Sequence, residues 1–247
     1  MVHDFLKRIC GEKIVDDILC NGRKVYTCKS DPFIPTEFAV AAYRYGHTQV
    51  PDDIAFNGNV NSPLFRGALG NGFDRLPNGI GGPDWRLFFG SSARPASAID
   101  IALAESMLDL PFVGRGGESS LATRNMLRSQ NFQMPSGQAV ADEIERITGE
   151  QFNRAPVDRL DLPAELHHHT PLWLYILAEG YLSNGETLGP VGGRLVAEVL
   201  IGLLECDPTS WLGSNRNWVP EFMRDTRATW DMEALINFAT QGDYATP

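Results

Sequence analysis

Apolar residues recur at helical spacing along most of the chain. The N-terminal stretch "HDFLKRICGEKIVDDIL" predicts two short helices that separate near Gly11. Pro35 and Thr36 suit the start of a further helix, which we expect to extend from about Glu37 to Gln49. The helical pattern returns after residue 116, in "ESSLATRNMLRSQ", "PSGQAVADEIERITG", "TPLWLYILAEGYL" and "GPVGGRLVAEVLIGLLECD". This pattern predicts a mainly α fold.

Polar residues and glycines mark where these helices begin and end. Ser119, Ser120 and Ser136 are candidate N-caps, and Gly149 suits a C-terminal cap. The two glycines at positions 192 and 193 lie in the first turn of the last helix and lower its helix propensity. We therefore expect another backbone to approach that turn closely.

Residues 51–116 depart from the helical pattern. Turn-forming residues dominate "PDDIAFNGNVNSP" and "LPNGIGGPDW", so we expect long irregular loops, interrupted by short helices around Pro63–Ala68 and Ser97–Leu103. The earlier segment "NGRKVYTCK" predicts a turn with a short strand. The many aromatic residues of the 51–116 segment favour packing over disorder. We expect a single domain, residues 1–247, in which these loops cover a helical core.

Composition and charge narrow the range of partners. The formal net charge is −10, which argues against nucleic acid, because such binding depends on Lys and Arg neutralising phosphates. None of the four cysteines forms a CxxC pair, and we expect free or buried thiols. No apolar run reaches the ~18 residues of a membrane span. The start, "MVHDFLKR", lacks the features of a signal peptide, so the sequence assigns no compartment.

The stretch "AAYRYGHTQV" carries the first candidate chemistry. On a helix, Val40, Tyr43, Arg44 and His47 share one face. A histidine in this position is either a core side chain with satisfied hydrogen bonds or a metal ligand with a cation beside it. Gly46 removes a side chain next to the imidazole, where a flat group would need room to approach.

A second segment, "RNMLRSQ", offers partners for such a ligand. Asn125 and Arg128 are three residues apart and share a helix face. A histidine that binds metal through one nitrogen usually donates its other ring N–H to a fixed acceptor, and an Asn carbonyl can fill that role. An arginine one turn later can hold a carboxylate. The alternative is that Asn125 is a surface amide, and that Arg124 and Arg128 are solvated charges.

The blocks "EFAVAAYRYGHTQV", "LATRNMLRSQNFQMPSGQAVA" and "TPLWLYILAEGYLSNGETLGPVGGRLVAEVLIGLLE" resemble, in order and spacing, the animal-type haem peroxidases, particularly their bacterial members. The resemblance extends from Met1 to about Glu205. It implies that His47 is the proximal ligand of the haem iron and that Asn125 accepts its ring N–H. It also implies that Arg128 contacts a haem propionate and that Arg44 lies on the propionate side.

This resemblance implies a helical haem-peroxidase core that binds haem b without a covalent link. The family reduces hydrogen peroxide and oxidises a small electron donor. Its distal histidine, calcium-binding aspartate and distal arginine lie upstream of the proximal block, whereas only 46 residues precede His47 here. His3 matches a later scaffold helix of the family instead. The chain therefore resembles the proximal, C-terminal half. We expect no calcium site in it, weak peroxidase activity of the chain alone, and a separately encoded distal half as a candidate partner.

Two other functions stay open on the sequence alone. One is a fatty-acid dioxygenase of the same superfamily, although its radical-forming tyrosine lies three residues before the histidine, where Arg44 stands. The other is a non-catalytic haem-binding or haem-free helical scaffold. The cluster His167–His169 precedes a helix start and is typical of a solvated loop, with an adventitious metal site as the alternative.

Overall fold

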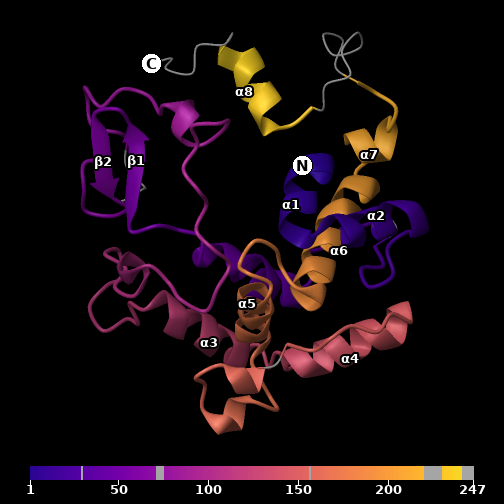
Figure 1. Ribbon diagram of the computed structural model, residues 1–247. Coiled ribbons are helices and arrows are strands. Elements are labelled where there is room, and N and C mark those ends of the chain that lie inside the picture. The colour runs from indigo at the N-terminus through magenta and orange to yellow at the C-terminus, as the bar shows by residue number, and fades with distance from the viewer. Residues whose placement is uncertain (29, 71–74, 156, 220–229, 241–247) are drawn as a thin grey trace. The chain divides into compact units, whose positions relative to one another are not determined.

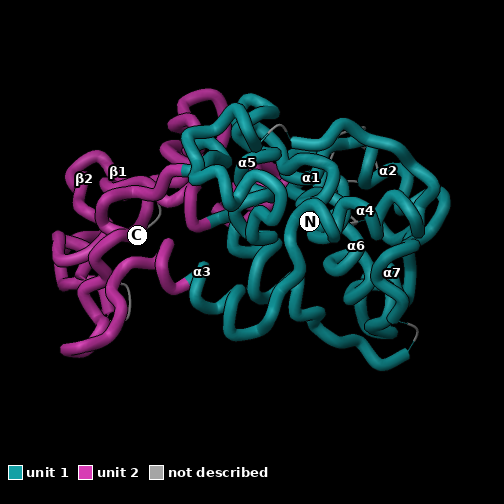
Figure 2. Tube along the Cα trace, turned by 90° about the horizontal axis from the view of Figure 1, so that it is seen from below, with its two compact units in different colours: residues 1–46, 98–101, 125–225 teal, residues 47–97, 102–124, 226–247 magenta. Residues whose placement is uncertain are grey.

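The computed structural model describes residues 1–28, 30–70, 75–155, 157–219 and 230–240. It confirms the mainly α fold, in which helices are joined by long irregular segments. The chain divides into two compact units, shown in different colours in Figure 2. The first comprises residues 1–46, 98–101 and 125–225, and the second comprises residues 47–97, 102–124 and 226–247.

Two apolar helices form the core of the first unit, α5 (Leu172–Leu182) and α6 (Pro190–Cys206). They pack on one another and on α1, α2 and α4, and this packing buries most of their residues (Figure 1). The first turn of α6 meets another backbone, as predicted. A Cβ atom added to Gly193 would lie 2.9 Å from the carbonyl oxygen of Cys10. A side chain at this position would therefore force the two segments apart.

The N-terminal helices and α4 of the first unit follow the predicted signals. The N-terminal pattern forms η1 (Val2–Leu6), α1 (Lys7–Cys10) and α2 (Glu12–Asn21), with the break at Gly11, whose φ is +86°. In α4 (Gly137–Thr148), the Ser136 hydroxyl accepts from the backbone N–H of Ala139, and Gly149 closes the helix with φ +74°. Short elements complete the unit: η6 (Val157–Arg159), η7 (Ala164–Leu166) and α7 (Trp211–Ser214).

The helix expected over residues 37–49 has a different form. A π-helical turn, η2 (Glu37–Ala41), is followed by a 3₁₀ segment, η3 (Ala42–His47). Because a 3₁₀ helix has three residues per turn, Arg44 and His47 still lie in line on it. The carbonyl of Arg44 accepts the indole N–H of Trp173 at 3.3 Å, so a tertiary contact fixes the backbone at this helix end.

The predicted strand in "NGRKVYTCK" is wrong for residues 21–28, and Lys29 lies outside the described residues. The backbone N–H groups of Lys24, Val25 and Tyr26 all donate to the carboxylate of Glu198 on α6. Since the side chain of Glu198 accepts these N–H groups, they do not pair with a neighbouring strand.

The second unit contains a β-hairpin that the sequence analysis assigned to turns. Strands β1 (Asp53–Asn57) and β2 (Val60–Pro63) pair antiparallel, with Asn57 opposite Val60. The short helices of this unit are η4 (Trp85–Leu87) and η5 (Glu105–Met107), whereas those expected around residues 63–68 and 97–103 do not form. Helix α8 (Met232–Thr240) also belongs to this unit. Within the described ranges, no helix has the length and apolarity needed to cross a membrane.

Candidate functional site

The structure joins two of the four predicted site residues directly. Arg44 lies in η3, and Asn125 lies in α3 (Leu121–Asn131), where the Ser120 hydroxyl accepts from Thr123 N–H as predicted. The Nη1 of Arg44 donates to the side-chain oxygen of Asn125 at 2.9 Å. Asn125 has no exposed surface. A buried amide requires hydrogen-bond partners, and this bond brings together two blocks that lie 81 residues apart in the sequence.

Two further contacts hold Arg44 in this position. Its Nε donates to the carbonyl of Ala39 at 2.9 Å, within the helix that precedes it. Its own carbonyl accepts from the indole of Trp173, which is 3% exposed at the start of α5. The sequence analysis did not select Trp173. The signal was available, because a buried indole N–H needs an acceptor and Trp173 is the single aromatic of its type in that helix.

His47 is the last residue of η3 and is half-buried. The preceding Gly46 is flanked by open space, since a Cβ atom added there would meet nothing within 4 Å. Burial raises the pKa of the neighbouring Tyr45, whose side chain is 4% exposed, so this phenol keeps its proton over the physiological range. The residue expected to bind metal therefore follows a rigid, buried tyrosine and an unobstructed glycine.

Arg128 follows Asn125 by one turn of α3 and is exposed. No carboxylate of the described residues forms an ion pair with it. Arg124, on the same helix, is also exposed and donates to the carbonyl of Glu118 at 3.1 Å. The two arginines thus differ. Arg124 binds the backbone of the segment that precedes α3, whereas the guanidinium of Arg128 is available to an anionic ligand.

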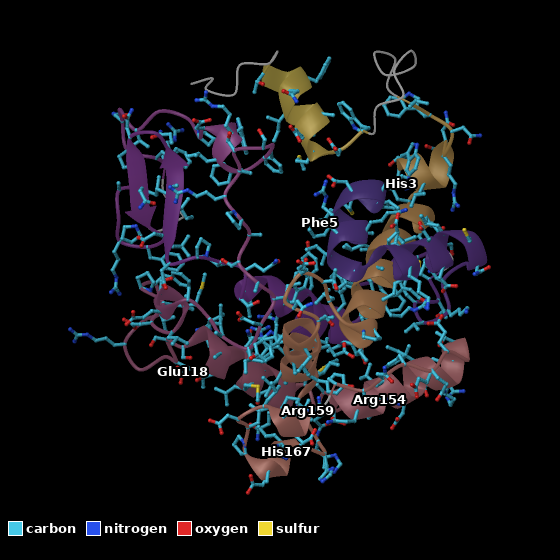
Figure 3. All side chains as sticks on the ribbon, in the orientation of Figure 1. His3, Phe5, Glu118, Arg154, Arg159 and His167 are labelled. Carbon is cyan, nitrogen blue, oxygen red and sulfur yellow. The ribbon has the colours of Figure 1, made fainter. Side chains whose placement is uncertain are left out.

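The other histidines have local contacts. The ring of His3 lies edge-on to Trp211, with 5.6 Å between ring centroids, and Figure 3 shows it near α7. A nitrogen of the His167 ring lies 3.0 Å from the carbonyl of Leu162, and His168 and His169 are exposed. Across the described ranges, no group of three or more His, Cys, Asp or Glu side chains is arranged to hold a metal ion. Since a haem iron needs only one protein ligand, this finding leaves His47 a candidate.

A cavity of about 430 Å³ in the first unit contains none of the four predicted residues. It is lined mainly by apolar side chains, among them Val25, Phe33, Phe38, Val140 and Leu195. Its chemistry is that of an apolar pocket, and it does not include Arg44 or Asn125.

Comparison with known proteins identifies the fold of this chain but does not assign the chain to a family. No protein-family model matches the sequence, and no curated protein matches it. Among solved structures, the chain is similar to Peroxidase A from Dictyostelium discoideum, with a TM-score of 0.53 and 16% sequence identity. The match covers 96% of this chain and 48% of the other, so this chain spans about half the length of that protein. The fold is therefore peroxidase-like.

Proposed function

We propose that this chain forms the proximal, haem-binding half of a haem peroxidase that reduces hydrogen peroxide at the expense of a small electron donor. In this proposal His47 supplies the axial nitrogen to the iron of a non-covalently bound haem b. Asn125 accepts the other ring N–H of His47, Arg128 contacts a propionate, and Arg44 lies on the propionate side. The fold, which is similar to that of a named peroxidase, supports the assignment.

The residues present fit such a group. An imidazole is a ligand for haem iron, and guanidinium groups pair with carboxylates through charge-assisted hydrogen bonds. Although the chain carries a net charge of −10, Arg44 bonds to Asn125, and Arg128 follows Asn125 by one turn of α3, so two cations are available to an anionic ligand. The open space at Gly46 leaves room for a planar group beside His47.

One observation carries the proposal. The hydrogen bond from Arg44 to the fully buried Asn125 links the helix that ends in His47 to the helix that contains Arg128. An amide oxygen can accept two hydrogen bonds, so the bond from Arg44 is compatible with a second one from the ring of His47. An acceptor held in this way would fix the imidazole orientation and raise its basicity.

When bound, the haem supplies the redox chemistry with peroxide, and the chain's own residues control its environment. Asn125, through the ring N–H of His47, tunes how strongly the imidazole donates to the iron. Arg128 would pair with a propionate through charge-assisted hydrogen bonds, and Arg44 would add positive charge on the same side. Trp173 keeps the backbone of Arg44 in place, so it acts as a positioning residue.

The proposal is tested by haem titration of the purified chain and of the His47→Ala variant. We expect the wild-type chain to bind one haem with a Soret band characteristic of histidine ligation, and the variant to lose that band or to bind at least ~10-fold more weakly. His167→Ala is the matched control, because its ring lies against the backbone carbonyl of Leu162 and takes no part in the candidate site. Identical Soret bands and affinities for wild type and His47→Ala would refute the assignment.

A further inference from the structure

The segment from Arg23 to Cys28 lies along one face of α6. Glu198 accepts three successive backbone N–H groups from this segment, and the ring of Tyr26 lies directly over Gly202. The Nε of Arg23 donates to Glu205 at 2.7 Å. Positions 198, 202 and 205 of α6 follow the spacing of one helix face. Side chains and backbone thus dock this segment on α6 along its whole length.

Two cysteines meet at the end of this docked segment. Cys28 is its last described residue and is 5% exposed, and Cys206 is the last residue of α6. Their sulfur atoms lie 2.6 Å apart. This separation is longer than the ~2.05 Å of a disulfide bond, and both residues are free thiols in this structure. They are separated by 178 positions in the sequence.

The surrounding contacts hold the two thiols together. An Nη of Arg23 donates to the carbonyl of Cys28 at 3.0 Å, while the Nε of the same side chain binds Glu205, the residue before Cys206. Arg23 therefore bridges the backbone on one side of the thiol pair to the helix on the other. Removal of either sulfur would leave this bridge in place, so the thiols do not create the contact between the segments.

We propose that Cys28 and Cys206 form a reversible disulfide when the chain meets hydrogen peroxide. Cys206 is the more accessible of the two and reacts first. Its thiolate attacks a peroxide oxygen, the S–O bond forms, the O–O bond breaks, and the leaving hydroxide takes up a proton to become water. Cys28 then attacks this sulfenic acid, the S–S bond forms, and a second water leaves. Two thiols and one peroxide thus yield one disulfide and two waters, with two electrons passing from sulfur to oxygen.

The pKa of Cys206 affects how fast the reduced pair reacts. The hydrogen bond with Cys28 raises this pKa, and burial and the nearby Glu205 raise it further, whereas Arg23 lowers it. Because the thiolate is the reactive form, the raised pKa lowers the thiolate fraction at neutral pH, and oxidation by peroxide should become faster as pH rises. The inference involves neither haem nor His47, so it can fail while the proposed function stands.

The disulfide would also fix one wall of the 430 Å³ cavity. Val25, Tyr26 and Thr27, which lie between Arg23 and Cys28, line this cavity opposite residues of α4. In the reduced chain these residues are held by non-covalent contacts alone. Oxidation would tie the end of this wall covalently to α6.

The test uses the reduced chain of residues 1–247 without haem, treated with a small excess of hydrogen peroxide, alkylated and mapped by mass spectrometry. We expect the loss of two hydrogens from the intact mass, one cross-linked peptide pair containing Cys28 and Cys206, and reversal by dithiothreitol. Two other cysteines serve as internal controls. Burial raises the pKa of Cys10 to about 12, and Cys20 is exposed. Both should remain single thiols that form no cross-link. A closed loop of this length should raise the melting temperature by about 5–15 °C.

Two variants separate the mechanism from general thiol oxidation. In Cys28→Ser, Cys206 should accumulate as a sulfenic acid that a dimedone-type reagent traps. In Cys20→Ser, disulfide formation should be unchanged. Cross-linking of Cys206 to any other cysteine, irreversible oxidation of Cys206 in the wild type, or persistence of both thiols while Cys20 is consumed would each overturn the proposal.

Discussion

Glu179 provides the sharpest test of the energetics of the first unit. It lies on α5, is 3% exposed, and accepts hydrogen bonds through one carboxylate oxygen from the backbone N–H groups of Val191 and Gly192, in the first turn of α6. Its other oxygen has no hydrogen-bond partner among the described residues. Burial raises the pKa of Glu179 to about 8, although both N–H groups and the charge of Arg154 act in the opposite direction.

The sign of the effect follows from the two states. The folded chain keeps the Glu179 proton until pH approaches 8, whereas the unfolded chain releases it near 4.5. The stabilising contribution of the neutral carboxyl is therefore complete below about pH 4.5 and is lost as pH rises towards 8. The difference of about 3.5 between the two pKa values, at about 1.36 kcal/mol for each unit, corresponds to roughly 5 kcal/mol as an upper limit.

The perturbation is Glu179→Gln, which keeps a carbonyl oxygen for Val191 and Gly192 and removes the titration. We expect the free energy of unfolding of the variant, minus that of the wild type, to grow by several kcal/mol between pH 5 and pH 8. Native stability is typically about 5–15 kcal/mol, so a change of this size is readily measured. Urea denaturation at fixed pH values, followed by tryptophan fluorescence, gives both free energies.

A matched control shows whether the effect is specific to the buried carboxyl of Glu179. Glu186 lies in the connection between α5 and α6 and is exposed, so Glu186→Gln should change stability by less than about 0.5 kcal/mol at every pH. Parallel pH profiles for wild type and Glu179→Gln would show that the carboxyl is already ionised in the folded chain. The reasoning from burial would then be refuted, and the two N–H groups would have to outweigh desolvation.

Three further predictions concern the candidate site and the docked segment. Asn125→Ala should weaken haem binding by ~10–100-fold relative to Asn131→Ala at the exposed end of α3, and equal affinities in a haem titration would contradict the role of Asn125. Gly202→Ala should destabilise the fold by about 1–3 kcal/mol, because its Cβ would overlap the ring of Tyr26. Gly46→Ala should leave thermal stability unchanged, since its Cβ meets only open space, and should still reduce haem affinity. Thermal denaturation and haem titration of Gly202→Ala and Gly46→Ala test these two predictions.

Local signals explain which parts of the fold the sequence predicts well. The Ser136 cap, the Gly149 stop and the break at Gly11 each depend on residues within a few positions of one another. The hairpin of the second unit has such a signal too, because Gly58-Asn59, between the paired residues Asn57 and Val60, is a typical two-residue hairpin loop. No strand was expected here, because turn-forming residues dominate this segment and the strands that they connect are short.

The candidate site is less accessible to local reasoning. Arg44 and Asn125 can be selected from their blocks, yet the hydrogen bond between them joins positions 81 residues apart, and no periodicity encodes that contact. The same holds for Glu198, whose carboxylate replaces the expected strand pairing of residues 24–26. In both places a buried side chain supplies hydrogen bonds that the sequence analysis had assigned elsewhere.

The position of Arg44 also bears on the choice between a peroxidase and a fatty-acid dioxygenase. The dioxygenase alternative requires a tyrosine three residues before the histidine, and a phenol has a single O–H donor. At this position the structure uses two donors in different directions, Nε towards Ala39 and Nη1 towards the buried Asn125. A guanidinium meets this demand because its donors are held in a fixed fork. A tyrosine in its place would leave at least one acceptor without its partner, at a cost of about 1–3 kcal/mol for a buried group. The surroundings of Arg44 are thus built for an arginine, which favours the peroxidase proposal.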